Sequence, residues 1–194
     1  MTVTVKNAQS KNLQIGPTIV TRGLVSCWDA ASVYSYPRTG DTWYDLVKQN
    51  TNNGSLYNMS SANFSEDGVG SLILDGTDDY IAVPNDTSLN AGAGDSFSVT
   101  AWIKPSTDVF TSTYIVGKRG LGSTVLPGWC VQINRVSMAT HQWQFVDVAI
   151  MDSAGKSRTF PRSTDTYSLN EWHHIALTYE NNQTVSLYGN GELV

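Results

Sequence analysis

The sequence predicts an all-β protein, an antiparallel β-sandwich preceded by an extended N-terminal arm. Charged residues make up only 15% of the 194 residues, whereas Ser, Thr, Asn and Gly are abundant, a composition typical of strands and turns. No window of ten residues or more repeats apolar residues at the spacing of an α-helix. Short strand-like segments are separated instead by Gly, Pro and Asn turns, a pattern that favours an antiparallel sandwich or jelly roll.

Residues 1–22 are expected to form the arm, because they lack a core pattern and contain the chain-breaking pair Gly16-Pro17. Residues 23–194 are then expected to form a single sandwich domain. The arm carries a charge of +3, and the remaining residues hold nine basic and 17 acidic side chains, a net charge of −8. Either the arm docks on an acidic partner surface, or its charges are scattered along a disordered terminus. These arm charges are Lys6, Lys11 and Arg22.

The clearest strand signal lies between residues 96 and 104, where side chains alternate between two faces. The apolar face holds Phe97, Val99, Ala101 and Ile103. The other face holds Ser96, Ser98, Thr100, Trp102 and Lys104. Further strands are expected at residues 24–28, 55–57, 71–74, 80–83, 114–116, 129–133, 142–149, 172–179 and 184–188.

The chain ends on a hairpin signal. Asn190-Gly191 is typical of a type I′ turn, in which both central residues have φ > 0, and Glu192 begins the returning strand. Because an uncovered strand edge promotes aggregation, we expect the sheet to be completed by further C-terminal residues or by strands of a neighbouring subunit, and we favour the former.

Four motifs occur in a fixed order along the chain. They are G-L-V-S-C-W-D-A (23–30), T-W-Y-D-L with N-N-G-S-L (42–46 and 52–56), L-I-L-D-G-T-D-D-Y-I (72–81) and E-W-H-H-I-A-L-T-Y with Y-G-N-G (171–179 and 188–191). Together they resemble the laminin-G-like, concanavalin A-like jelly-roll domains, most of all those in structural proteins of tailed phages, marine ones in particular. The resemblance covers residues 23–194 and implies two antiparallel sheets, one concave and one convex.

The resemblance also implies a function. Domains of this kind mostly bind glycans or proteins, and some are virion components. We therefore expect a non-enzymatic virion protein of a tailed phage, a capsid decoration or a tail or fibre component, assembled in the host cytoplasm. Its expected partners are other virion proteins or further copies of itself, and host-surface glycan. The alternatives are a free-standing glycan-binding lectin module and, third, a divergent glycoside hydrolase.

Charge and hydropathy narrow the partners further. Residues 23–194 are acidic overall and lack the basic face that nucleic-acid binding requires, so nucleic acid is not an expected partner. The sequence contains no apolar run of 18 residues and no signal-peptide pattern, so membrane insertion is not expected.

Catalysis is not expected either. A retaining glycosidase needs two carboxyl groups about 5 Å apart, and the pairs Asp41/Asp45 and Asp75/Asp79 lie in turn-rich segments. The four glutamates are isolated from one another, and the E-x-D-x-x-E strand motif of the related glycosidases is absent.

Three aromatic residues are the candidate glycan contacts, since sugar faces stack on aromatic rings. Trp102 falls on the strand face opposite the apolar residues, whereas Trp43 and Tyr44 are expected in a loop. The alternative, which we favour for Trp102, is that these rings are framework residues of the sandwich.

Asp75, Asp78 and Asp79 could supply oxygen ligands to calcium, and no other cofactor is expected. Asp and Gly are also the residues that a tight turn between two strands requires, and we favour this structural role. His173 and His174 are adjacent on a strand, so they should point to opposite faces and cannot chelate one ion. We interpret both histidines as framework residues.

The two cysteines, Cys27 and Cys130, both lie in strand-like apolar segments. A disulfide between them is an alternative, but we favour two buried thiols.

Overall fold

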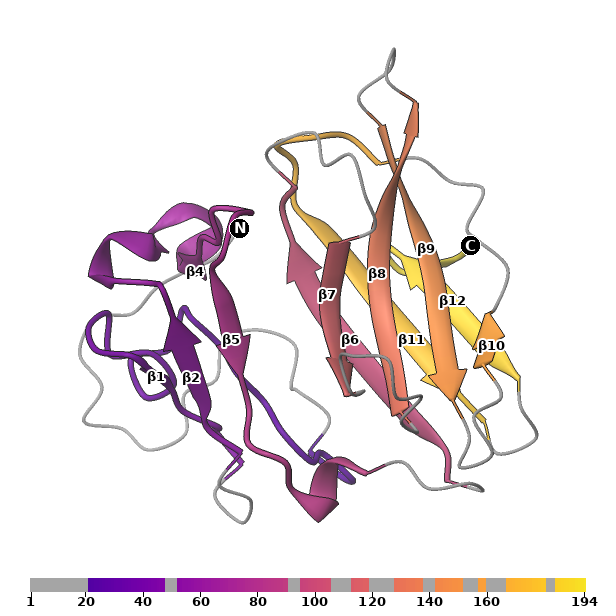
Figure 1. Cartoon of the computed structure of the whole chain (residues 1–194), viewed down its shortest axis with the longest axis horizontal. Helices are drawn as coiled ribbons and strands as arrows, with labels where there is room; N and C mark the ends of the chain where they lie inside the picture. Colours follow the sequence, from indigo (N-terminus) through magenta and orange to yellow (C-terminus); the bar gives the residue numbers. More distant parts are fainter. Residues whose placement is uncertain are drawn as a thin grey trace. The chain divides into compact units, whose positions relative to one another are not determined.

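The computed structural model describes residues 21–47, 52–90, 95–105, 113–118, 128–137, 142–151, 157–159, 167–180 and 184–194. The chain divides into two compact units, residues 1–88 and residues 89–194. The described elements are antiparallel strands and short 3-10 helices, with no α-helix among them (Figure 1). The predicted all-β fold is therefore confirmed. None of the described helices is long and apolar enough to span a membrane.

The first unit contains a three-stranded sheet and a two-stranded sheet. The order in the larger sheet is β1-β2-β5, and β3 pairs with β4. The bounds are β1 Thr42–Trp43, β2 Gly54–Tyr57, β3 Phe64–Ser65, β4 Ser71–Leu72 and β5 Tyr80–Ala82. The 3-10 helices are η1 Ser61–Asn63, η2 Asp67–Val69 and η3 Thr87–Leu89, the last of which crosses the unit boundary.

The strand predicted at residues 24–28 is wrong. No strand is assigned there, because the backbone of Cys27 bonds to a turn and not to a neighbouring strand. Its N–H group donates to the Asp45 carboxylate at 2.9 Å, and its carbonyl accepts from the Leu46 N–H at 2.9 Å. Cys27 and Cys130 are both free thiols, and Cys130 is fully buried while Cys27 is half-buried.

The second unit is a sandwich of two four-stranded sheets, whose orders are β13-β12-β11-β6 and β10-β9-β8-β7. Figure 1 shows the two sheets as separate layers. The first comprises β6 Phe97–Ile103, β11 His173–Tyr179, β12 Val185–Gly189 and β13 Glu192–Leu193. The second comprises β7 Thr113–Lys118, β8 Gly128–Ser137, β9 Gln142–Met151 and β10 Ser157–Thr159.

The core of this unit lies between the two sheets. Apolar side chains on alternate residues of β8, β11 and β12 meet there, because successive residues of a strand point to opposite faces. The buried residues of this cluster are Val131, Ile133, Tyr167, Ile175, Leu177 and Leu187. Phe97, Ala101 and Ile103 of β6 pack against them, as the alternation predicted.

The hairpin at the end of the chain forms as predicted. Asn190 and Gly191 have φ values of 51° and 90°, and β13 pairs with β12 through Tyr188–Leu193 and Gly189–Glu192. Positive φ at both positions is what a type I′ turn requires.

Candidate functional site

The outward face of β6, β11, β12 and β13 is the candidate functional surface, and we call it the outer face. Trp102 is its most exposed aromatic residue, with 66% of its surface accessible. Residues of β6 alternate between half-buried and exposed from Phe97 to Ile103, so the core occupies one side of the strand and Trp102 the other. The structure places Trp102 where the alternation predicted, and its contact with a ligand stays a prediction.

His174 lies directly opposite Trp102 on the neighbouring strand β11. The two rings are 5.1 Å apart between centroids and are tilted by 50°. An exposed indole beside an imidazole offers a planar apolar surface next to a hydrogen-bonding group, which suits a sugar ring. The sequence-based interpretation grouped His174 with the framework residues, whereas the structure places it on the outer face.

The next row of side chains crosses all four strands of the sheet. Strand pairing joins Thr100 to Ala176, Ala176 to Tyr188, and Tyr188 to Leu193. Leu193 is 68% exposed, and Tyr188 is half-buried. Because Ala176 adds only a methyl group between its neighbours, the outer face combines flat apolar surface with hydroxyl groups.

His173 points the other way and is a framework residue, as predicted. Only 5% of its surface is exposed. Its Nε2 lies 3.0 Å from the carbonyl oxygen of Ser168, and its ring meets the edge of Tyr167 at 5.1 Å. The two adjacent histidines therefore occupy opposite faces of β11 and do not form a joint metal site.

Asn190 connects the hairpin turn to the start of β11. Its N–H donates to the His174 carbonyl at 2.8 Å, and its Oδ1 accepts from the His174 N–H at 3.0 Å. These two hydrogen bonds hold the backbone of His174 from the side opposite Trp102. Register and turn geometry thus position His174, and neither can be read from the local sequence around it.

Trp43 and Tyr44, the other candidate aromatic residues, belong to the first unit. The expected loop is partly wrong, since Trp43 is the last residue of β1. Trp43 is half-buried, and its Nε1 is buried with no hydrogen-bond partner among the described residues. Tyr44 is 42% exposed, and its backbone is held by Ser35 through bonds of 2.7 and 2.6 Å. Trp43 is thus oriented inward, whereas Tyr44 keeps an accessible ring.

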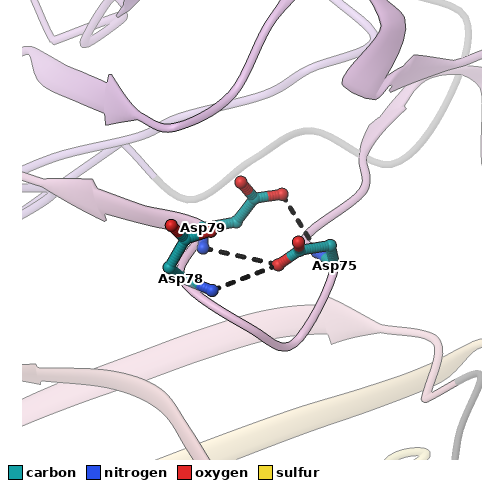
Figure 2. Close-up of side chains that lie close together, drawn as sticks. All are labelled: Asp75, Asp78 and Asp79. Atoms are coloured by element: carbon teal, nitrogen blue, oxygen red, sulfur yellow. Dashed lines mark hydrogen bonds between the residues drawn. The ribbon is translucent and has the colours of Figure 1, made fainter.

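Asp75, Asp78 and Asp79 come together in the turn before β5, as Figure 2 shows. One carboxylate oxygen from each lies within 4.8 Å of the others. The Asp75 Oδ1 accepts from the N–H groups of Thr77 at 2.7 Å, Asp78 at 3.3 Å and Asp79 at 3.5 Å. Asp79 Oδ2 accepts from the Asp75 N–H at 3.0 Å.

This geometry fits the turn role that we favoured. The N–H groups directed at Asp75 Oδ1 are donors, and they already engage this carboxylate oxygen in the turn. Calcium prefers six to eight oxygen ligands, more than three carboxylates provide with one oxygen each. Calcium binding by these residues stays a prediction.

The same hydrogen bonds make the turn sensitive to acid. The backbone N–H of Thr77 above all, with those of Asp78 and Asp79, holds the pKa of the Asp75 carboxyl below its usual value. Because the folded-state pKa is the lower one, the carboxylate stabilises the fold fully above about pH 4, and this contribution is lost as the pH falls through the lowered pKa.

Asp75→Asn keeps an acceptor oxygen but does not ionise. Its midpoint of thermal unfolding, followed by circular dichroism, should fall less than that of wild type between about pH 5 and pH 3. Identical pH dependence in the two proteins would contradict this role.

Most of the basic arm, Lys6 and Lys11 included, lies outside the described residues. Arg22 is exposed and follows directly on the first described residue, Thr21. Docking of these charges on a partner stays a prediction.

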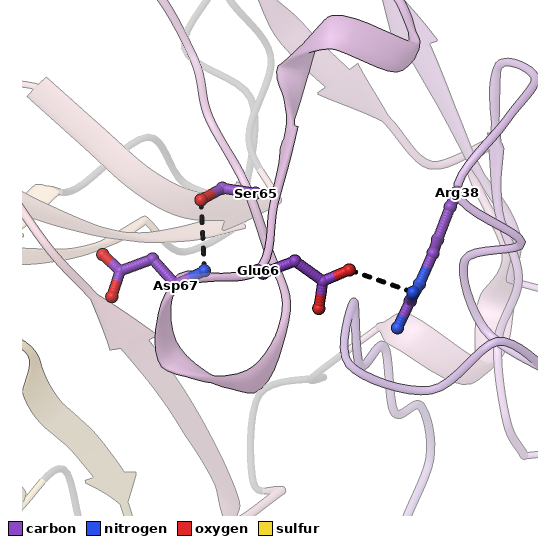
Figure 3. A network of polar contacts seen from close by, with 4 residues as sticks. All are labelled: Arg38, Ser65, Glu66 and Asp67. Atoms are coloured by element: carbon purple, nitrogen blue, oxygen red, sulfur yellow. Dashed lines mark hydrogen bonds and ion pairs between the residues drawn. The ribbon is translucent and has the colours of Figure 1, made fainter.

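Glu66 and Arg38 form a surface ion pair, with 3.0 Å between Oε1 and Nη1 (Figure 3). Their side chains are 71% and 44% exposed, so the pair contributes little to stability. The Arg38 guanidinium also lies 5.0 Å from the centroid of the Phe64 ring. The Glu66 carboxylate is therefore already paired with a basic group.

The comparisons with known proteins define the family. The model of the concanavalin A-like lectin/glucanases superfamily, in its laminin G form, matches residues 75–194. No curated protein and no solved structure matches the chain. The chain therefore belongs to the concanavalin A-like lectin/glucanases superfamily, and its fold is compatible with carbohydrate binding. The match gives no information about a phage or a virion.

Proposed function

We propose that this protein is a non-catalytic glycan-binding module, and that the outer face around Trp102 is its binding surface. The observation that carries the proposal is the pairing of a largely exposed indole with His174 on a regular sheet. A framework Trp would be buried against the core, whereas Trp102 is largely exposed. Aromatic faces flanked by hydrogen-bonding groups are well suited to sugar rings.

The proposal that the module is non-catalytic is supported by what its acidic side chains do. Asp75 and Asp79 accept hydrogen bonds that hold their own turn. Asp45 Oδ1 accepts from the N–H groups of Cys27 and Val47, each at 2.9 Å. Each of these carboxylates has a local structural partner, which is not the arrangement of a free acid and base flanking a substrate bond.

Within this proposal, the module belongs to the virion of a tailed phage, assembled in the host cytoplasm and displayed with its outer face toward host-surface glycan. Support comes from the ordered set of four motifs, which resembles phage structural proteins. The partners would be other virion proteins or further copies of the chain. An antibody against this chain should label particles purified from lysates of its host. Labelling of the particle-free supernatant alone would favour a free-standing lectin.

Trp102→Ala tests the glycan site directly. Truncating a central aromatic contact typically costs about 2 kcal/mol, so we expect the dissociation constant for a bound glycan to rise about 30-fold. Affinity electrophoresis through gels that contain polysaccharide identifies the polysaccharides that retard the protein. Calorimetry with these polysaccharides then measures the change in the dissociation constant.

The matched control is Tyr34→Ala, because Tyr34 is an 83% exposed aromatic residue of the first unit. This variant should bind like wild type. Equal loss in the two variants would show that the effect is not specific to the outer face. Release of reducing ends from the retarding polysaccharide would refute the non-catalytic assignment.

A further inference from the structure

We propose that Tyr57 and Tyr80 form an oxidative cross-linking site in the first unit. A carbon–carbon bond between their rings, as in dityrosine, would lock the turn-rich segment that the two residues enclose. This site is separate from the outer face, whose strands belong to the second unit, and it does not depend on glycan binding.

The two tyrosines lie directly opposite each other on the antiparallel strands β2 and β5, which run side by side in Figure 1. Their ring centroids are 4.6 Å apart, and the ring planes differ by only 4°. Because directly paired residues leave the same face of a sheet, both hydroxyl ends point away from it. The ring carbon next to the hydroxyl group, Cε, of one tyrosine therefore faces its counterpart on the other.

The chain around the pair holds the two rings in this arrangement. On one side, Leu56 pairs with Ile81 in the same sheet, and Leu56 is buried. On the other side, the side-chain amide of Asn58 donates to the carbonyl oxygen of Asp78 at 2.9 Å. Reactants held in place combine far more readily than freely diffusing ones, so a radical on one ring meets the other ring before it meets another chain.

Both tyrosines are accessible to an oxidant, since Tyr57 is 45% exposed and Tyr80 is 50% exposed. Stacking across a strand pair stabilises a sheet without any hydroxyl group. Neither hydroxyl has a hydrogen-bond partner in the part of the chain that the structure describes. Each phenol is therefore free to release its proton to solvent when it is oxidised.

Two further ring contacts that involve tyrosine lack this chemistry. Tyr36 contacts Phe64, and Tyr179 contacts Phe97. A phenylalanine ring has no hydroxyl group and does not form a phenoxyl radical. Tyr36 is also fully buried, which shields it from an oxidant. Coupling within one chain is therefore directed to the pair on β2 and β5.

The reaction uses hydrogen peroxide, acting through a haem peroxidase, as the oxidant. Each phenol loses one electron and its hydroxyl proton and becomes a phenoxyl radical. The two radicals couple through a Cε carbon of each ring, and the protons on these carbons then move to the oxygens, which restores both phenols. Overall, two tyrosines lose two hydrogen atoms, and one molecule of hydrogen peroxide is reduced to two of water.

The new bond closes residues 58–79 into a covalent loop. This segment contains η1, β3, η2 and β4. Closing a loop reduces the conformational entropy of the unfolded chain, as a disulfide does. The midpoint of thermal unfolding of the cross-linked monomer should therefore be at least about 5 °C higher than that of the untreated protein.

The experiment treats the full chain, at low concentration, with hydrogen peroxide and a haem peroxidase. Glu66 is the only glutamate between the two tyrosines, and the next one along the chain is Glu171. After denaturation, a glutamate-specific protease separates fragments 1–66 and 67–171 of the untreated protein. The treated protein should keep them joined, with dityrosine fluorescence and a mass lower by two hydrogen atoms. A reducing agent in the digest excludes a disulfide between the fragments.

Tyr57→Phe and Tyr80→Phe are the decisive variants, because each keeps the stacked ring and removes a phenol. Circular dichroism checks that they fold like wild type. Each should reduce the joined species at least about tenfold. Tyr34→Phe is the matched control, since Tyr34 is an 83% exposed tyrosine on the same fragment as Tyr57, and it should leave the joined species unchanged.

Three outcomes would overturn the inference. They are an undiminished joined species in Tyr57→Phe or Tyr80→Phe, dityrosine found only between chains, and no joined species in the treated wild-type protein. A cross-linked monomer that unfolds at the same temperature as the untreated protein would refute the locking of the segment. None of these results bears on glycan binding by the outer face.

Discussion

Leu177→Ala should lower the free energy of unfolding of the second unit by about 3 kcal/mol. Leu177 is 1% exposed and lies in the cluster between the two sheets. Replacing a fully buried Leu with Ala removes transfer free energy and leaves a cavity, which together cost about 2–5 kcal/mol. The midpoint of thermal unfolding should fall by about 10 °C, and calorimetry measures this.

Thr178→Ala provides the matched control, since Thr178 is the next residue on β11 and points to the outer face. Loss of its side chain opens no space in the core, so the expected change stays within about 1 kcal/mol. If the two variants unfolded at the same temperature, the assignment of the β11 faces would be wrong.

Gly189→Ala should destabilise the same unit by about 3 kcal/mol, because the site has no room for a methyl group. A Cβ on Gly189 would overlap the Tyr167 hydroxyl and lie 2.6 Å from its Cζ. Tyr167 is 8% exposed and belongs to the core cluster, so its ring cannot swing into solvent. Urea unfolding followed by tryptophan fluorescence measures the loss.

Combining Gly189→Ala with Tyr167→Phe tests the cause. Removing the hydroxyl relieves the closest overlap, so the double variant should be more stable than the sum of the two single effects predicts. Strict additivity would mean that the methyl group is accommodated by another movement of β12.

The sequence was most informative where local pattern and tertiary structure agree. The strand Phe97–Ile103 forms within the predicted segment 96–104, one residue shorter at each end, because it alternates strictly and one of its faces meets the core. Asn190-Gly191 formed the predicted turn because few other residue pairs tolerate positive φ twice. By contrast, residues 24–28 have an apolar strand-like composition, but the Asp45 carboxylate competes for the Cys27 N–H. Side-chain competition of this kind has no signature in a short window.

The candidate site was predictable only in part, because it depends on strand register, which a short window of sequence does not reveal. Alternation placed Trp102 on the free face, but its partner lies 72 residues further along the chain, at His174. Only the register between β6 and β11 makes them neighbours. Continuing the alternation of β11 would have put His174 on the exposed side, although not opposite Trp102. Strand β10, Ser157–Thr159, was missed because it is short and polar.

The hydrogen bonds of Asn190 have a consequence for the thermodynamics of binding. Asn190 engages both the N–H and the carbonyl of His174, and its Nδ2 lies 3.5 Å from Nδ1 of His173. The backbone at the start of β11 is therefore already ordered before any ligand arrives. Since ordering of side chains and loops is a principal cost of association, a sugar that stacks on Trp102 would lose little conformational entropy from the protein.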